Sequence, residues 1–91
     1  MAVTVKIPPQ LRAATGGEGA VSAEGGTVGD VLSALYERHG ELRERVAGED
    51  GTPRRFVNVY LDGEDIRFLD GLATPVADGA ELQILPAVAG G

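Results

Sequence analysis

Residues 27–40, TVGDVLSALYERHG, decide the fold because they predict its main helix. Thr27, followed three residues later by Asp30, is typical of the capping arrangement at a helix start. We expect Gly40 to end the helix. An apolar helix face requires another element to cover it, and here four aliphatic side chains recur at helical spacing on one face: Val28, Val31, Leu32 and Leu35.

Two strands are expected before this helix. Residues 2–7, AVTVKI, alternate apolar and polar side chains with the period of two that is typical of a half-buried strand. Pro8 and Pro9 end this strand. A weaker alternation in residues 18–24, EGAVSAE, predicts a second strand that pairs back on the first.

A short helical segment and a hairpin are expected after the main helix. Residues 41–46, ELRERV, place two apolar side chains at helical spacing. Residues 56–61, FVNVYL, and 64–68, EDIRF, flank the pair Asp62-Gly63. This pair favours a tight type I′ turn because both central residues of such a turn need a positive φ.

The last predicted strand is AELQIL, residues 80–85, which follows a second Asp-Gly pair and ends at Pro86. The order of two strands, one helix and two or three strands predicts an α+β fold, in which a mixed sheet packs on one main helix. The helix face should then contact strand residues Val3, Val5, Val59 and Ile84.

Composition excludes several classes of function. The 91 residues suffice for one small domain, and 14 acidic against 8 basic residues give a net charge of −6 without a basic stripe, so we expect no nucleic-acid partner. The sequence contains neither a membrane-length apolar run nor a signal-peptide pattern, so we expect a cytoplasmic protein without membrane contact. The absence of cysteine excludes disulfides and thiolate chemistry, and a single histidine disfavours a small catalytic subunit.

The remaining polar candidates are interpreted as structural. His39 lies in the last helical turn, where a cation favours the negative end of the helix dipole. We expect no metal site and no bound cofactor. Arg54 and Arg55 are interpreted as part of a solvated loop, with contact to an acidic partner left open. Turn chemistry is favoured over metal binding for the acidic cluster Asp62, Glu64 and Asp65.

The end of the chain carries a family resemblance. Residues 76–91, VADGAELQILPAVAGG, combine an Asp-Gly turn, a final strand, a proline and a free Gly-Gly end. This run resembles the closing signature of the ubiquitin-like sulfur-carrier family that contains the thiamine and molybdopterin carriers ThiS and MoaD. Residues 55–68, RFVNVYLDGEDIRF, and 71–79, GLATPVADG, resemble more narrowly the cysteine-biosynthesis branch of that family. The likeness extends from Val3 to Gly91.

The resemblance implies a β-grasp fold whose first and last strands lie side by side in parallel at the centre of the sheet. It implies a domain over residues 1–86 and a tail over residues 87–91. It also implies that the Gly91 carboxylate is adenylated with MgATP by an E1-like enzyme of the MoeB/ThiF type and then becomes a thiocarboxylate. The implied later partners are a PLP-dependent cysteine synthase and a JAMM-type metalloprotease. The chain would then be a protein cosubstrate, not an enzyme.

The tail itself suits insertion into a partner. Pro86 fixes its own φ and biases Leu85 toward extended geometry, so the tail should leave the sheet in one direction. The five tail residues can reach about 16–18 Å. Gly90 and Gly91 carry no Cβ that could clash near the reacting carbon. We assign the tail to Ala87, Val88, Ala89, Gly90 and the reacting Gly91.

A docking surface is predicted beside the tail. If Val57, Val59 and Leu61 face the helix, alternation places Phe56 and Tyr60 on the opposite face of the sheet. Leu85 should share that face, which would then be unusually apolar. Aromatic residues are favoured as interface anchors, so we predict partner binding through Phe56, Tyr60 and Leu85.

Three other functions remain open from the sequence. A ubiquitin-like modifier would be joined to lysines through Gly91 by the same activation, and a molybdopterin-synthase small subunit would use the same tail. A β-grasp binding module without terminal chemistry would be indifferent to deletion of Gly91. The sequence does not determine which sulfur acceptor or sulfur source is used.

Overall fold

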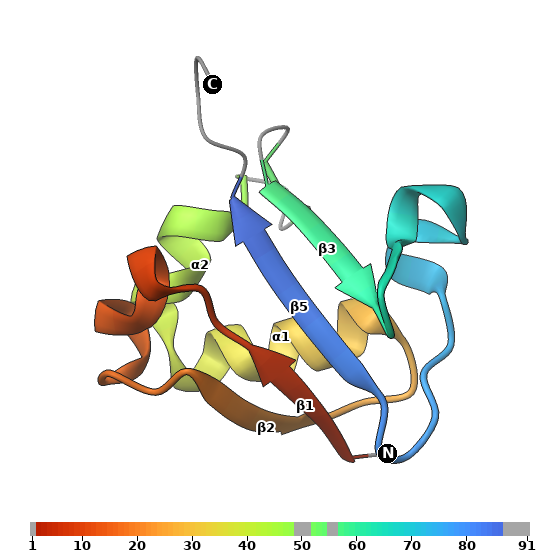
Figure 1. Cartoon of the computed structure of the whole chain (residues 1–91), viewed down its shortest axis with the longest axis horizontal. Coiled ribbons are helices and arrows are strands. Elements are labelled where there is room, and N and C mark those ends of the chain that lie inside the picture. The colour runs from red at the N-terminus through yellow and green to blue at the C-terminus, as the bar shows by residue number, and fades with distance from the viewer. Residues whose placement is uncertain (1, 49–51, 55–56, 87–91) are drawn as a thin grey trace.

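The computed structural model describes residues 2–48, 52–54 and 57–86 (Figure 1). Among these residues, no helix is long and apolar enough to cross a membrane. Three 3-10 turns lie between the main elements: Pro9–Thr15, Ile66–Phe68 and Gly71–Ala73. The helices and strands are β1 (Ala2–Lys6), β2 (Ala20–Glu24), α1 (Val28–Arg38), α2 (Gly40–Val46), β3 (Val57–Leu61), β4 (Glu64–Asp65) and β5 (Glu81–Pro86).

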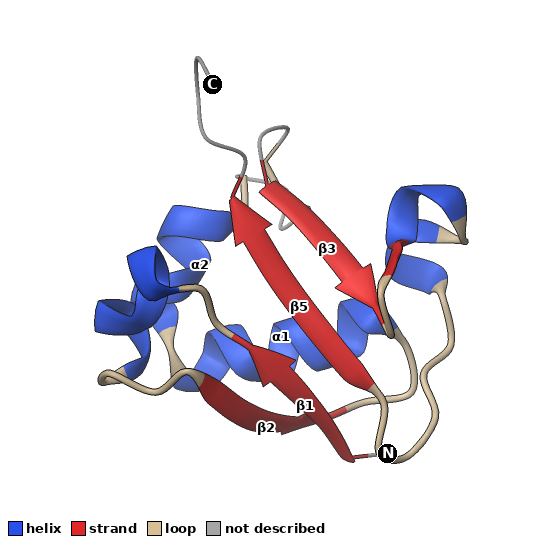
Figure 2. Ribbon diagram, in the orientation of Figure 1, coloured by secondary structure: helices blue, strands red, loops and turns tan. Residues whose placement is uncertain are grey.

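The five strands form one mixed sheet in the order β2-β1-β5-β3-β4, and α1 crosses one of its faces (Figure 2). β1 and β5 run parallel, with Val5 opposite Leu82. The other neighbouring strands are antiparallel. The first and last strands therefore lie side by side within the sheet, and the predicted β-grasp arrangement is confirmed.

The core lies between the sheet and α1, as the helical spacing predicted. The Thr27 side-chain oxygen accepts a hydrogen bond of 3.2 Å from the Asp30 N–H, which confirms the predicted cap. Leu32 is 2% exposed, and its three aliphatic neighbours on the same helix face have no exposed surface. The four predicted strand partners are equally buried and belong to the same core: Val3, Val5, Val59 and Ile84.

The helix ends differently from the prediction. α1 ends at Arg38, and His39 caps it by donating its N–H to the Leu35 carbonyl at 2.9 Å. Gly40 does not adopt a left-handed conformation and instead begins α2. The physical reason is that His39 already leaves helical geometry, with φ −134° and ψ 74°. The predicted segment 41–46 is confirmed as part of α2, and its Leu42 is fully buried.

The predicted hairpin is present but its second strand is short. Asp62 and Gly63 have φ values of 48° and 88°, which confirms the turn. β4 pairs with β3 only at Glu64 and Asp65, whereas the prediction extended this strand to residue 68. The chain leaves the sheet at once because the Asp65 carboxylate accepts a 2.9 Å hydrogen bond from the Arg67 N–H and thereby caps the turn Ile66–Phe68.

Candidate functional site

The structure describes the strand that leads to the predicted reactive tail. Gly91 and the four residues before it lie outside the described residues, as does Phe56. β5 remains paired with β3 as far as Pro86, which lies opposite Val57. Ile84, two residues earlier, has no exposed surface. The root of the tail, Leu85 and Pro86, is therefore fixed to the centre of the sheet.

Tyr60 and Leu85 lie on the sheet face that points away from α1. β3 buries Val57 and Val59 toward the helix, so alternation turns Asn58 and Tyr60 to the opposite face. Asn58 lies opposite Leu85 in the pairing of β3 with β5, which places Tyr60 and Leu85 diagonally across the two strands. Both side chains are half-buried. The predicted shared face is confirmed for these two residues, and their binding role stays a prediction.

This face is more polar than the sequence suggested. Asn58 and Gln83 occupy positions between Tyr60 and Leu85 in the strand register. The Arg67 guanidinium also reaches this side, where its Nη2 donates a 2.8 Å hydrogen bond to Asn58 Oδ1. Alternation within each strand already places Asn58 and Gln83 on this face, but the prediction singled out only its apolar members. Arg67 follows β4 and lies outside that pattern.

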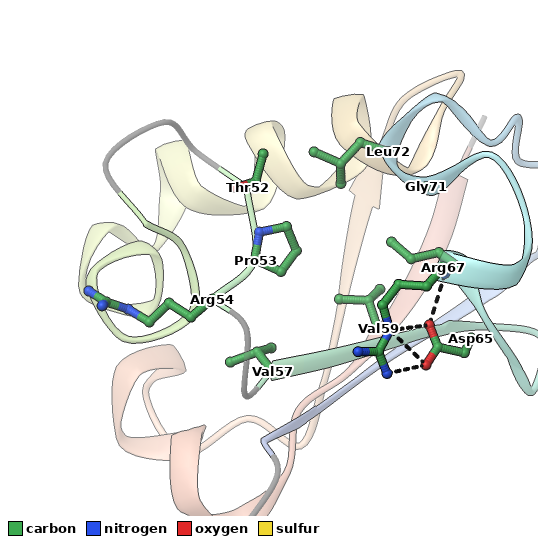
Figure 3. Close-up of a pocket in the computed structure, with 10 residues that line it drawn as sticks. Thr52, Pro53, Arg54, Val57, Val59, Asp65, Arg67, Gly71 and Leu72 are labelled. Carbon is green, nitrogen blue, oxygen red and sulfur yellow. Dashed lines mark hydrogen bonds and ion pairs between the residues drawn. The ribbon is translucent and has the colours of Figure 1, made fainter.

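Asp65 and Arg67 form the best-defined charged pair (Figure 3). The Arg67 Nη2 donates to Asp65 Oδ2 at 2.7 Å, and its Nε lies 3.2 Å from both carboxylate oxygens. Hydrogen bonds from the Arg67 side chain and from its backbone hold the pKa of the Asp65 carboxyl below its usual value. Asp62 is also engaged, because its Oδ1 accepts a 3.0 Å bond from the Glu81 N–H. Turn chemistry thus accounts for these two carboxylates.

Asp65→Asn should therefore destabilise the fold in a pH-dependent way. The lowered pKa means that folding favours the ionised carboxylate, so its contribution is complete above the usual value of 3.8 and is lost as pH falls through the folded value. Chemical denaturation should show a larger deficit for the variant near pH 7 than near pH 3. Glu64→Gln, at an exposed neighbour, is the matched control. A deficit that is equal at both pH values would contradict the assignment.

A pocket of about 210 Å³ lies beside β3 and is bordered by Asp65 and Arg67 (Figure 3). Its walls include Pro53, Val57, Val59 and Leu72, while the Arg54 side chain extends away from it. The Arg54 Nη2 instead donates a 3.0 Å hydrogen bond to the Glu44 carbonyl. Among the residues that the structure describes, the one carboxylate in the wall is already paired with Arg67, so the described wall offers apolar contact without a free acid–base group. Arg55 lies outside the described residues.

The titratable groups at the end of α1 do not form a catalytic pair. The Tyr36 hydroxyl is buried without a hydrogen-bond partner among the described residues. Burial raises the pKa of Tyr36 to about 12, and the charge of Arg43 opposes part of this shift. Tyr36 is therefore neutral at physiological pH. His39 lies at the helix end, as predicted, and its backbone makes the cap.

Comparisons with known proteins agree with this geometry. The ThiS family matches residues 5–91. The chain is 50% identical over 93 residues to the sulfur carrier protein CysO of Mycobacterium tuberculosis, and the match covers 100% of both chains. It is 43% identical over 65 residues to small archaeal modifier protein 3 of Haloferax volcanii, covering 71% of this chain and 70% of that protein.

Two solved structures have the same fold as this chain over nearly its whole length. The crystal structure of the Amycolatopsis orientalis BexX/CysO complex contains a chain with a TM-score of 0.89 and 48% identity, and the match covers 98% of this chain and 99% of that one. The crystal structure of Mycobacterium tuberculosis CysO has a TM-score of 0.86 and 49% identity, with 94% and 99% covered. The nearly complete family match, the whole-length relatives and the shared sheet topology together show that this chain belongs to the ThiS family.

Proposed function

We propose that this chain is a sulfur carrier whose Gly91 carboxylate is adenylated by an E1-like enzyme and converted to a thiocarboxylate. The whole-length 50% identity to the sulfur carrier protein CysO is the observation that carries this proposal. The anchored root of the tail supports it, because β5 holds Pro86 opposite Val57 and the family match extends from there through Gly90 and Gly91.

The chemistry requires a partner because a free carboxylate is a poor acyl donor. An α-carboxyl has a pKa of about 3.5, so Gly91 is ionised at neutral pH. A carboxylate oxygen attacks the α-phosphorus of MgATP, the bond to the β-phosphate breaks, and pyrophosphate leaves. Sulfide then attacks the acyl carbon, and AMP leaves with the former carboxylate oxygen. If an enzyme-bound persulfide is the nucleophile instead, a second thiol of the partner must cleave the S–S bond of the resulting acyl disulfide, which releases the thiocarboxylate and leaves a disulfide on the partner. The partner holds MgATP, and the chain contributes the carboxylate, the reach of the tail and the docking surface.

We assign the carrier to cysteine biosynthesis as its first candidate pathway. The relatives with 50% and 48% identity are CysO proteins, one of which is part of a complex with BexX. In this pathway the thiocarboxylate sulfur would form a bond to the β-carbon of an activated serine derivative held by a PLP-dependent cysteine synthase, and the activated hydroxyl group of that derivative would leave. An acyl shift follows, and a JAMM-type metalloprotease releases cysteine. The carrier is consumed and regenerated as a cosubstrate and does not catalyse these steps.

The similarity to an archaeal modifier protein supports a second candidate. A ubiquitin-like modifier uses the same adenylate at Gly91 but transfers the acyl group to a lysine amine, which leaves an isopeptide bond. The 43% identity to small archaeal modifier protein 3 covers 71% of this chain. The product therefore distinguishes the two candidates, because only the carrier accumulates a terminal thiocarboxylate.

Intact-mass measurement tests the proposal. The purified chain is incubated with an E1-like enzyme of its own host, MgATP and sulfide, and the peptide that ends at Gly91 is then analysed. We expect this peptide to gain the mass difference between one sulfur and one oxygen, and omission of MgATP should prevent the gain. Lysine conjugates without a thiocarboxylate would favour the modifier, and an unchanged mass would contradict both candidates.

Tyr60→Asp should weaken docking to the activating enzyme while the isolated domain stays folded. The half-buried ring lies diagonally from Leu85 at the root of the tail, so a carboxylate at this position would be desolvated by a partner seated there. We expect a loss of affinity of about tenfold or more in a calorimetric titration. Ser33→Asp adds the same charge at an exposed position on α1 and is the control. Equal affinity of both variants and the native chain would remove Tyr60 from the docking surface.

A further inference from the structure

A groove lies directly beside the root of the tail, between β5 and the segment that follows β1. It is lined by Lys6, Pro9, Arg12, Gln83 and Leu85, among others. Lys6 lies opposite Gln83 in the parallel pairing of β1 with β5, and Leu85 follows two residues later on the same face. The groove therefore opens on the sheet face that carries Tyr60 and Leu85.

Two cations on this groove have no carboxylate partner among the residues that the structure describes. The described ion pairs join Arg45 to Glu41 and Arg67 to Asp65, and neither pair includes Lys6 or Arg12. Both cations are exposed. These two exposed positive charges contrast with the net charge of −6 that the whole chain carries.

The backbone holds Arg12 in place. Its Nε donates a 3.1 Å hydrogen bond to the Ile7 carbonyl. The guanidinium also lies against Gly19, where an added Cβ would be 3.1 Å from its central carbon. A guanidinium that is positioned before binding loses less side-chain entropy when it meets an anionic partner.

Four carboxylates lie at the other end of the sheet. β1 and β5 both run from that end toward the tail, and β3 runs back to it. The strand starts and the hairpin turn there carry Asp62, Glu64, Asp78 and Glu81. Glu81 also borders the groove, at the end far from Leu85. Lys6 and Arg12 therefore lie nearer to the root of the tail than these four carboxylates do.

We propose that Lys6 and Arg12 form a cationic docking edge that receives carboxylates of the enzyme that takes up the tail. The proposal rests on the proposed function, because an enzyme that acts on Gly91 must approach within the reach of five residues from Pro86, about 16–18 Å. The surface beside Leu85 then faces this enzyme, and its two cations are complementary to acidic side chains around the opening that admits the tail. Paired charges at such a rim steer the encounter and fix the orientation of the two proteins.

Charge reversal tests the docking edge. The full chain, the double variant Lys6→Glu/Arg12→Glu and Arg12→Lys are titrated calorimetrically against the E1-like enzyme of the same host without MgATP. Thiocarboxylate formation is then followed at increasing carrier concentration at about 50 and about 300 mM salt. Arg38→Glu is the control for a single charge reversal elsewhere, because Arg38 is exposed at the end of α1, the helix that covers the other face of the sheet.

We expect the double variant to bind at least tenfold more weakly and to raise KM by a similar factor, with kcat changed less than twofold. Its rate should also depend less on salt than that of the native chain. Arg12→Lys should stay within threefold of the native chain and Arg38→Glu within twofold. An affinity of the folded double variant within twofold of the native chain, or an equal loss in Arg38→Glu, would overturn the docking edge.

These measurements distinguish a failure of the docking edge from a failure of the proposed function. If the native chain binds the enzyme but gains no sulfur, the proposed function fails and the calorimetric comparison still decides the docking edge. If sulfur transfer proceeds and charge reversal leaves KM unchanged, the docking edge fails and the proposed function stands.

Discussion

Deleting Gly91, or adding one residue after it, should reduce thiocarboxylate formation by at least about 100-fold, although the body of the protein still folds and still docks. The reacting carbon must lie within about 3 to 3.5 Å of the atom that it meets, and one residue moves it by about 3.3 Å or more. The root of the tail cannot compensate by sliding, because β5 is held between β1 and β3 and Ile84 is fully buried. Intact mass after incubation with the activating enzyme, MgATP and sulfide measures the effect.

Two substitutions that keep the tail length complete this experiment. Val88→Ala preserves both the length and the Gly-Gly end, so its rate should stay within about threefold of the native rate. Gly90→Val keeps the length but adds a branched side chain, and it should react poorly if the channel around the tail is narrow. Unfolding midpoints of all variants should match the native chain. An extended chain that gains sulfur as readily as the native one would contradict the proposed role of this terminus.

Leu32→Ala should lower the free energy of unfolding by about 2 to 5 kcal/mol. Leu32 is 2% exposed at the centre of the α1 face, so its truncation removes buried apolar contacts and leaves a cavity beneath the sheet. Urea denaturation with an unchanged m-value would measure the loss as a change in stability alone.

Leu69→Ala makes the same chemical change at a site that is 36% exposed, and it should cost less than about 1 kcal/mol. The difference between the two variants reports the burial of Leu32. A cost below about 0.5 kcal/mol for Leu32→Ala would remove this side chain from the core.

Local sequence patterns predicted the elements well where one face of each element is buried. The four aliphatic residues of α1 and the alternation in β1 repeat with clear periods, and each side chain lies where its period places it. The pairing of β1 with β5 joins Thr4 to Glu81, and no local pattern specifies a partner so distant. That arrangement followed from the family resemblance.

The errors arose where one element depends on a neighbour. Gly40 was expected to end the helix, yet α2 begins there because Leu42 and Val46 continue the apolar pattern into the core. The turn Pro9–Thr15 was not predicted because its three buried side chains, Leu11, Ala14 and Thr15, form too short a repeat to identify.

The sequence predicted only part of the candidate site, because some of its residues lie on different elements. Tyr60 and Leu85 were placed on one face by alternation alone. Lys6 and Arg12 were not singled out, because they lie on different elements and border one groove only through the way the chain turns after β1. A search for cations close to the predicted start of the tail could have found Lys6, since it ends the first strand.

The central place of β5 also couples completion of synthesis to folding. A polypeptide that stops before Glu81 lacks the buried Leu82 and Ile84, and it leaves β1 and β3 without the strand that joins them. Such a product cannot assemble the sheet, so it also cannot present the surface on which Tyr60 and Leu85 meet. We therefore expect truncated translation products not to compete with the full chain for the proposed enzyme partner.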